Sequence, residues 1–196
     1  MTTERASDHP IEPLFLKRWS PRAFDASDMP IDDLLSTLEA ARWAPSAYNV
    51  QPWRFLYARR GDAHWNLFVG ILNDFNRSWA EHASALVVVV SNTLMTDEAD
   101  GAKRTFPSHS FDTGAAWAHL ALQATALGYQ AHAMAGIDFD HARTVLKVPD
   151  SYAIEIAVAI GTTANPKQLP EPLQAREQPS DRLDLNDIAY EGAFPS

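Results

Sequence analysis

The chain has 196 residues, of which 46% are apolar and 21% are charged. This length and composition are typical of one soluble domain with a sizeable core, and the apolar content excludes disorder throughout. The longest purely apolar run, Ala85 to Val90, is far shorter than the roughly 20 residues that a helix needs to cross a bilayer. We therefore expect no membrane-spanning segment.

Charge and cysteine content exclude further classes of function. The chain has 16 Lys and Arg residues and 25 Asp and Glu residues. Its net charge of −9 opposes non-specific binding to nucleic acid or acidic membranes. The chain has no cysteine, which excludes disulfides, thiolate catalysis and cysteine-bound metals. The seven histidines show no ligand spacing, so no metal site is indicated. Residues 1–10 lack the apolar stretch of a signal peptide, and a cytoplasmic protein is expected.

The periodicity of apolar residues predicts helices and strands along residues 11–161, the expected core of a single domain over 1–196. Pro30 is expected to open a helix that Pro45 ends, and Gly128 to follow a long Ala-rich helix. Taken in chain order, the predicted elements are a helix at 11–18, the helix from Pro30, a strand at 54–58, a helix at 64–72, a strand at 85–91, a helix at 111–127, a strand at 130–135, a helix at 141–146 and a strand at 152–160. Long helices and non-adjacent strands indicate an α+β or α/β layered domain.

Two segments carry no such periodicity. Residues 92–108 are polar and are expected to form an irregular loop, a candidate lid. Residues 162–196 contain five prolines and few large apolar side chains, so they cannot build a core of their own. Composition leaves two alternatives for this segment: it is disordered, or it lies extended along another surface such as a second subunit.

Several nucleotide and hydrolase motifs are absent. The chain contains no G-x-G-x-x-G, no P-loop and no G-x-S-x-G. The first informative motif is instead the extended stretch Arg18-Trp19-Ser20-Pro21-Arg22. Alternate residues of an extended chain point the same way, so two guanidinium groups and a hydroxyl share one face. They suit a phosphate beside a second anionic centre, although a solvated basic connector has the same pattern.

The second motif is the stretch from Ala44 to Trp53, which leaves a helix and enters a strand. Two prolines stiffen it, and it presents Ser46, Asn49 and Gln51. A rigid loop with amides can bind the edge of a planar heterocycle. The alternative is a turn whose Asn and Ser side chains bond to their own backbone.

Together these motifs resemble the FMN-dependent nitroreductase family. The resemblance rests on R-W-S-P-R-A-F followed by A-P-S-A-Y-N-V-Q-P-W-R-F. Weaker similarities follow in order: Asn76 ahead of the central strand, the helix that ends in A-L-G at Gly128, the loop Met134-Ala135-Gly136-Ile137, and Arg182 in S-D-R-L-D-L. The resemblance implies an α+β fold with a central antiparallel sheet, an intertwined homodimer, and a C-terminal arm, residues 162–196, packed on the partner subunit.

The resemblance also implies where FMN would bind. Arg18 and Ser20 are expected to hold its phosphate, with Arg182 closing the site, and Gly136 to offer its backbone N–H to flavin N5. Arg22 is expected near the N1/O2 edge, where reduction places negative charge, or else at a second phosphate or surface contact. The remaining expected cofactor contacts are Trp19, Pro45, Ser46, Ala47, Asn49, Gln51, Asn76 and Ala135.

Some of these positions have alternatives. Asn76 is expected to bond the pyrimidine edge of the ring, but a helix-capping role is equally compatible with the sequence. Pro45, Ser46 and Asn49 are expected to reach the cofactor from the neighbouring subunit. The chain departs from many relatives at Ala135, where they have an acidic residue, and at Trp79, where some have a lysine.

The implied activity is that of an oxidoreductase with a ping-pong cycle. NADH or NADPH would reduce FMN and leave, and a small organic acceptor such as a nitroaromatic, a quinone or an activated alkene would then take its place. One alternative is an FMN-binding redox sensor or carrier without efficient turnover. Another is an α+β interaction domain without a cofactor, which requires all the motifs to be accidental.

Overall fold

The fold is built on a four-stranded sheet in a computed structural model that describes residues 5–195. Every neighbouring pair in the sheet is antiparallel, and the order of the strands is β1-β2-β6-β5. The strands are β1 (Trp53–Arg59), β2 (Ala85–Asn92), β5 (Gln130–Met134) and β6 (Tyr152–Gly161). The expected α+β architecture with a central antiparallel sheet is therefore confirmed.

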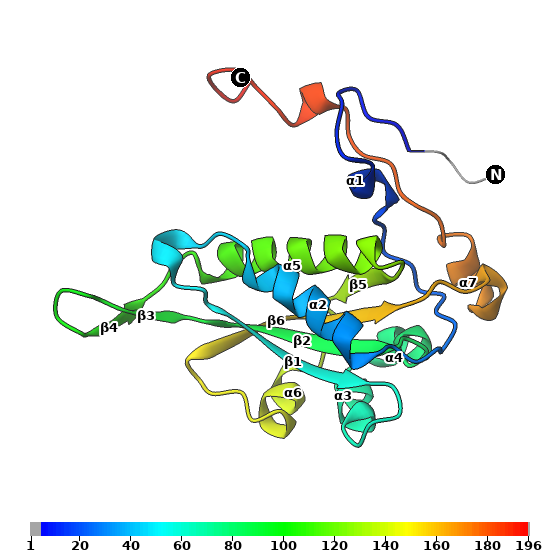
Figure 1. Cartoon of the computed structure of the whole chain (residues 1–196), viewed down its shortest axis with the longest axis horizontal. Coiled ribbons are helices and arrows are strands. Elements are labelled where there is room, and N and C mark those ends of the chain that lie inside the picture. The colour runs from blue at the N-terminus through cyan, green and yellow to red at the C-terminus, as the bar shows by residue number, and fades with distance from the viewer. Residues whose placement is uncertain (1–4, 196) are drawn as a thin grey trace.

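Helices cover both faces of this sheet (Figure 1). α2 (Ile31–Arg42) and α5 (His109–Ala126) pack on one face, and α3 (Trp65–Gly70), α4 (Asp74–Ala80) and α6 (Phe139–Val145) contribute to the core on the other. The shorter elements are α1 (Pro13–Lys17), α7 (Glu171–Gln174) and three single turns at Ala47–Asn49, Pro166–Gln168 and Leu185–Asp187. No helix in residues 5–195 has the length and apolarity needed to cross a membrane.

The apolar run of β2 explains the three layers. Successive side chains of a strand point to opposite faces, so a strand that is covered on both faces needs apolar residues at every position. Val88 and Val90 belong to the core beneath α3, α4 and α6, whereas Val87 and Val89 belong to the core beneath α2 and α5. The continuous run predicted a buried strand, and its burial on both sides confirms that prediction.

The long helix α5 ends as the sequence indicates. It starts at His109, two residues before the predicted start, and its cap at Leu127 is followed by Gly128 with φ +91°. A left-handed residue after the cap is the usual way to end a helix, and glycine adopts it without strain. The helix from Pro30 also matches, with Pro30 as the N-cap of α2 and its last residue, Arg42, ahead of Pro45.

Two expectations about local structure are wrong. The segment expected to be irregular, residues 92–108, contains a hairpin of β3 (Leu94–Thr96) and β4 (Lys103–Thr105). Ion pairs from Arg104 to Asp97 and Asp100 across the turn stabilise these polar strands, which no apolar pattern marks. The sequence reading also missed α4, which Asn73 caps by accepting a hydrogen bond from the Asn76 N–H at 2.9 Å. Its seven residues include only two large apolar side chains, Phe75 and Trp79, which is too few for a helical pattern.

The first part of the C-terminal segment packs against the body of its own chain. Thr163 forms a bridge with Phe24, and Leu169 and Leu173 are buried in the core beside α4. Only after Glu177 does the segment leave the body, and it then runs beside the N-terminal residues (Figure 1). Any part of it that could reach a partner therefore begins later than the expected boundary at residue 162.

The packing of α5 on the sheet predicts a large effect of truncation at Leu120, whose side chain is fully buried. Leu120→Ala is expected to lower the free energy of unfolding by about 2–5 kcal/mol, because it removes apolar contacts and leaves a cavity. Urea denaturation at fixed protein concentration measures this change. The control is Leu67→Ala on the exposed face of α3, and an equal loss in both variants would contradict the assigned core.

Candidate functional site

A cavity of about 380 Å³ gathers five arginines from three parts of the chain. Arg18 and Arg22 come from the extended stretch after α1, Arg5 from the N-terminal segment, and Arg176 and Arg182 from the C-terminal segment. The other lining residues are Trp19, Ser20, His132, Gln178 and Ser180. No carboxylate is among the described residues that line it. Such a donor set suits a phosphate dianion.

Backbone carbonyls position two of these arginines, Arg5 and Arg182, and Arg182 donates from Nη1 to the Asp181 carbonyl at 2.9 Å. Arg5 donates from Nη1 to the Arg18 carbonyl at 2.7 Å and from Nε to the Ser180 carbonyl at 3.0 Å, so it joins both ends of the chain. Burial, and then the charge of Arg182, lower the pKa of Arg5 and Arg18. Arginine nevertheless stays protonated in proteins. The cavity therefore concentrates positive charge that an anion would neutralise.

His132 on β5 forms the floor between these arginines and α4. Burial is the largest cause that lowers its pKa to about 4, with a smaller contribution from the charges of Arg22 and Arg18, and the hydrogen bond to the Pro21 carbonyl at 2.8 Å opposes them. The ring is therefore neutral at physiological pH, with the proton on Nδ1 because a carbonyl can only accept. It lies 4.7 Å from the ring of Trp79.

Trp79 and Arg22 carry buried polar atoms without partners. Trp79 is fully buried on α4, and the Arg22 guanidinium lies 6.0 Å from its ring. Neither Trp79 Nε1 nor Arg22 Nε has a hydrogen-bond partner within residues 5–195. Such orphaned donors are uncommon in folded proteins and mark a site where a further group can bind.

Glu177 ties the C-terminal segment to the arginine stretch. Its Oε1 accepts the backbone N–H groups of Arg22 at 2.6 Å and Ala23 at 2.7 Å, and the residue is 9% exposed. Because the carboxylate bonds to the backbone, it holds Arg22 in place without neutralising its guanidinium through a direct ion pair.

The side chains of Asn73 and Asn76 surround Gly136, and we call these three residues the Gly136 cradle. Asn76 donates from Nδ2 to the Gly136 carbonyl at 3.1 Å, and the Asn73 N–H donates to the same oxygen at 3.1 Å. A Cβ at Gly136 would lie 2.4 Å from Asn76 Nδ2 and 2.5 Å from Asn73 Nδ2, so any larger residue would displace these two side chains. The Gly136 N–H has no acceptor in the described part of the chain. The capping alternative for Asn76 is wrong, because Asn73 is the cap.

The loop with Pro45, Ser46, Ala47, Asn49 and Gln51 lies at the other end of α5 (Figure 1). The Ala47 N–H donates to Asp112 Oδ2 at 3.0 Å near the start of α5. The Trp19 N–H, in contrast, donates to the side chain of Gln130 just beyond its end. The 18 residues of α5 span about 27 Å. One chain therefore does not bring these five residues to the arginine cavity.

This loop has a strained backbone. Tyr48, Asn49 and Gln51 all have φ near +50°, a conformation that costs of order 1 kcal/mol for residues with a Cβ. Ser46 Oγ accepts the Gln51 N–H at 3.0 Å, as the turn alternative predicted. Strain of this kind is common where a loop has a function.

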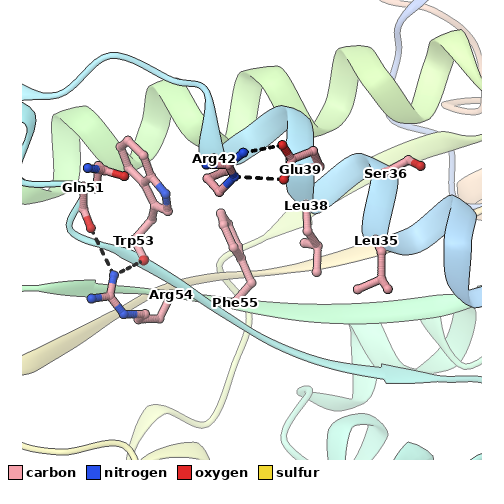
Figure 2. A pocket seen from close by; sticks show the side chains of 9 residues that line it. All are labelled: Leu35, Ser36, Leu38, Glu39, Arg42, Gln51, Trp53, Arg54 and Phe55. Atoms are coloured by element: carbon pink, nitrogen blue, oxygen red, sulfur yellow. Dashed lines mark hydrogen bonds and ion pairs between the residues drawn. The ribbon is translucent and has the colours of Figure 1, made fainter.

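Gln51 instead lines a separate open hollow of about 660 Å³ between α2 and β1 (Figure 2). Both arginines there are engaged: Arg42 with Glu39 at 2.5 and 2.8 Å, and Arg54 with the carbonyls of Gln51 and Trp53. Hydrogen bonds from Arg42 and then Trp43 lower the pKa of Glu39 to about 2. With its cations paired, this hollow is a poorer phosphate site than the arginine cavity.

The structure thus brings Arg18, Trp19, Ser20, Arg22 and Arg182 around one cavity, as the motifs indicated. Asn76 and Gly136 contact each other beside it, and Ala135 is exposed next to Gly136. Sequence reasoning missed Arg5, Arg176 and His132. No local pattern marks the first two, because they reach the cavity only through the path of the two terminal segments. His132 shows a signal only in hindsight, as a polar residue inside an apolar strand.

Comparison with known proteins agrees with this geometry. The Nitroreductase family matches residues 16–162. An uncharacterized 15.4 kDa protein of Mycolicibacterium smegmatis is 32% identical over 150 residues, 72% of this chain and 97% of that one. An NADH dehydrogenase of Thermus thermophilus is 28% identical over 173 residues, 76% of this chain and 84% of its own length.

Solved structures agree as well. The crystal structure of an oxidoreductase containing FMN superposes with a TM-score of 0.95 at 48% identity, over 100% of this chain and 98% of the other. Taken with the family match over most of the sequence, the arginine cavity and the glycine cradle lead to one conclusion: the chain belongs to the Nitroreductase family.

Proposed function

We propose that the protein is an FMN-dependent NAD(P)H oxidoreductase that reduces a small organic acceptor by a ping-pong mechanism. The observation that carries this proposal is the arginine cavity, with the Gly136 cradle four residues along the chain from its lining residue His132, in a chain of the Nitroreductase family. A nitroaromatic, a quinone or an activated alkene is the expected class of acceptor. The relatives named NADH dehydrogenase and oxidoreductase containing FMN support the cofactors.

The residues present fit FMN. The cavity has the cations for its phosphate, and Arg22, whose guanidinium forms no ion pair within residues 5–195, is one of the residues that line it. A second hollow of about 410 Å³ shares Arg18, Ser20 and His132 with the cavity and is otherwise lined mainly by apolar side chains. A ligand with one phosphate end and one planar end suits such a pair of hollows.

In this mechanism the chain binds and orients the cofactor. Arg18, Ser20 and Arg182 would hold the phosphate, with Arg5 and Arg176 adding charge. The free N–H of Gly136 would face flavin N5, and the Arg22 guanidinium would stabilise negative charge at the N1/O2 edge. When bound, FMN supplies the hydride chemistry between the nicotinamide and the acceptor. Asn76 would hold the Gly136 peptide at the right orientation through its hydrogen bond.

A complete site would need two copies of the chain in a homodimer. The loop at residues 45–51 lies too far from the arginine cavity for one FMN to touch both in the same copy. The exposed face of α5 supplies an interface: Phe111 is 83% exposed, and Gly114, Ala118 and Leu122 follow at helical spacing. Two such helices packed against each other would bring the loop of one copy toward the cavity of the other.

The C-terminal arm fits the same assembly. After Glu177, the exposed apolar side chains Leu183, Leu185, Ile188 and Phe194 find no core in their own chain. Exposed apolar groups in such number mark an interaction surface. We propose that this arm, from about Gln178 onward, packs on the partner subunit.

The first prediction concerns the phosphate. Arg18→Ala combined with Arg22→Ala is expected to weaken FMN binding at least a hundredfold, because each charge-assisted hydrogen bond contributes about 1.5–3 kcal/mol. Fluorescence titration with FMN measures the Kd. The matched control is Arg42→Ala, a paired surface arginine. Unaltered retention of FMN in the double variant would refute the phosphate assignment.

The second prediction concerns the dimer. Gly114→Glu is expected to give a monomer that loses FMN, because the new carboxylate would be buried in the interface. A Cβ at Gly114 has nothing within 4 Å in its own chain, so the subunit itself tolerates the change. Light scattering measures the mass, and Gly114→Ala is the control. A Gly114→Glu protein that remains a dimer places the interface elsewhere.

The third prediction tests the activity directly. The purified protein is expected to show flavin absorption bands that bleach when NADH or NADPH is added without oxygen, and that return when an acceptor is added. Bands that persist with both nicotinamides would favour the sensor or carrier function. If no band forms after FMN is supplied, the proposed cofactor is wrong.

A further inference from the structure

A second polar cluster lies at the opposite end of the sheet from the arginine cavity. It consists of Ser91 on β2, Glu155 on β6, and His109 and Ser110 at the start of α5. Ser91 Oγ lies 2.7 Å from His109 Nδ1 and 2.5 Å from Glu155 Oε1, and Ser110 Oγ donates to Glu155 Oε2 at 2.8 Å. The sequence contains no motif for this cluster, because its members are up to 64 residues apart.

The hydrogen bonds determine where the protons are. Ser91 has one hydroxyl proton and donates it to Glu155, so its oxygen must accept from His109. His109 therefore carries a proton on Nδ1, and Nε2 is the atom left for chemistry. Nε2 has no partner within residues 5–195 and is not among the buried polar atoms that lack one, so it reaches the surface. The His109 side chain as a whole is 22% exposed.

The hydrogen bonds run from the Nδ1–H of His109 to the Ser91 hydroxyl, and from this hydroxyl to the Glu155 carboxylate. In a serine hydrolase the histidine lies between the other two and bonds to an accessible serine. Here Ser91 is the middle group and is fully buried, so it cannot act as a nucleophile. What the arrangement does is orient the ring, because Ser91, which Glu155 holds in turn, accepts from Nδ1 and leaves Nε2 free. An imidazolium with an accessible Nε2–H can act as a proton donor.

The position of the cluster connects it with the acceptor site. Asp112, one turn along α5 from His109, accepts the Ala47 N–H of the loop that the proposed dimer brings to the partner's cofactor. The cluster and this loop are thus held on the same end of α5 (Figure 1). In the dimer, His109 of one copy would face the acceptor bound over the cofactor of the other.

We infer that His109 is the proton donor of the acceptor half-reaction, supplied in trans, with Ser91 and Glu155 as its positioning residues. The inference rests on the proposed function. In the reduction of an enone, the reduced cofactor gives a hydride that forms a C–H bond at the β carbon and breaks the C=C π bond. The displaced electron pair takes the proton from His109 Nε2, at the α carbon or the oxygen. Water then reprotonates the neutral imidazole, so the acceptor gains two electrons and two hydrogens.

The charges around His109 favour this role. Glu155 on β6 is the described carboxylate within 4 Å of a ring nitrogen. On the adjacent hairpin, Arg104 is paired with Asp97 and Asp100, and on α5 the Asp112 carboxylate bonds to the Ala47 backbone. Replacing Glu155 therefore removes the negative charge nearest to the ring.

The first experiment determines the tautomer of His109, and this measurement needs no turnover. Two-bond NMR correlations of isotope-labelled histidine in the cofactor-free protein are expected to show His109 with its proton on Nδ1. Glu155→Gln and Ser91→Ala are expected to shift it toward the Nε2–H form, because the relay that fixes the proton is broken. His141, which is exposed on α6, is the internal reference for the histidine signals. A His109 signal in the Nε2–H form in the wild-type protein overturns the relay.

The second readout separates the two half-reactions. Reoxidation of the reduced protein by cyclohexenone is expected to fall about a hundredfold in His109→Gln, while anaerobic reduction by the nicotinamide stays unchanged. His141→Gln is the matched control.

The outcomes distinguish the two proposals. Dithionite reduces the bound cofactor whether or not a nicotinamide does, so reoxidation can be measured in either case. If neither nicotinamide reduces the wild-type protein, the proposed function fails, whereas a His109-dependent reoxidation still supports the proton donor. Reoxidation at the wild-type rate in His109→Gln overturns the inference, even where the nicotinamide reaction works.

Discussion

Burial of the central sheet on both faces confines the polar chemistry of this protein to the ends of its strands. Val87 and Val89 lie under α2 and α5, and Val88 and Val90 under the opposite helices, so no polar group could be placed between them without loss of stability. The arginine cavity and Gly136 are at one end, and the loop at residues 45–51 is at the other. α5 keeps the two ends about 27 Å apart, and a second copy of the chain is what can join them.

The end of the sheet that holds the arginine cavity carries a concentration of positive charge. Five arginines converge without a carboxylate in the lining, and burial and mutual repulsion lower the pKa of Arg5, Arg18 and Arg22. Backbone carbonyls and the backbone-bound Glu177 hold these side chains without an ion pair that would cancel their charge. The neutral state of His132 adds no further positive charge. A bound phosphate would supply the missing negative charge, and its affinity would come from relieving this repulsion.

The other end of the sheet, which holds the His109 cluster, has a carboxylate at its centre. A carboxylate, two hydroxyls and one imidazole form a closed set of hydrogen bonds in which His109 Nε2 is the free atom. A dimer of the proposed kind would place a cationic cofactor site from one copy beside a proton donor from the other. Hydride and proton would then come from different subunits, so assembly and turnover would be linked.

Local patterns in the sequence were sufficient for much of the fold and part of the site. The apolar run of β2, the Ala-rich periodicity of α5 with its terminal Gly128, and the alternation of Arg18, Ser20 and Arg22 each depend on neighbours in the chain. Local signals failed where elements are largely polar: the hairpin of β3 and β4 is stabilised by Arg104, and α4 has only Phe75 and Trp79 as large apolar side chains.

The sequence by itself therefore determined the main elements, the excluded chemistries and the nucleus of the phosphate site. Only the tertiary structure showed that Arg5 and Arg176 join that site from the two ends of the chain, that Asn73 rather than Asn76 caps α4, and that two asparagine amides crowd the place where a Cβ at Gly136 would lie. The same holds for the His109 cluster. The reason is physical: these contacts join residues far apart in sequence, and no periodicity encodes a contact that depends on how separate elements pack.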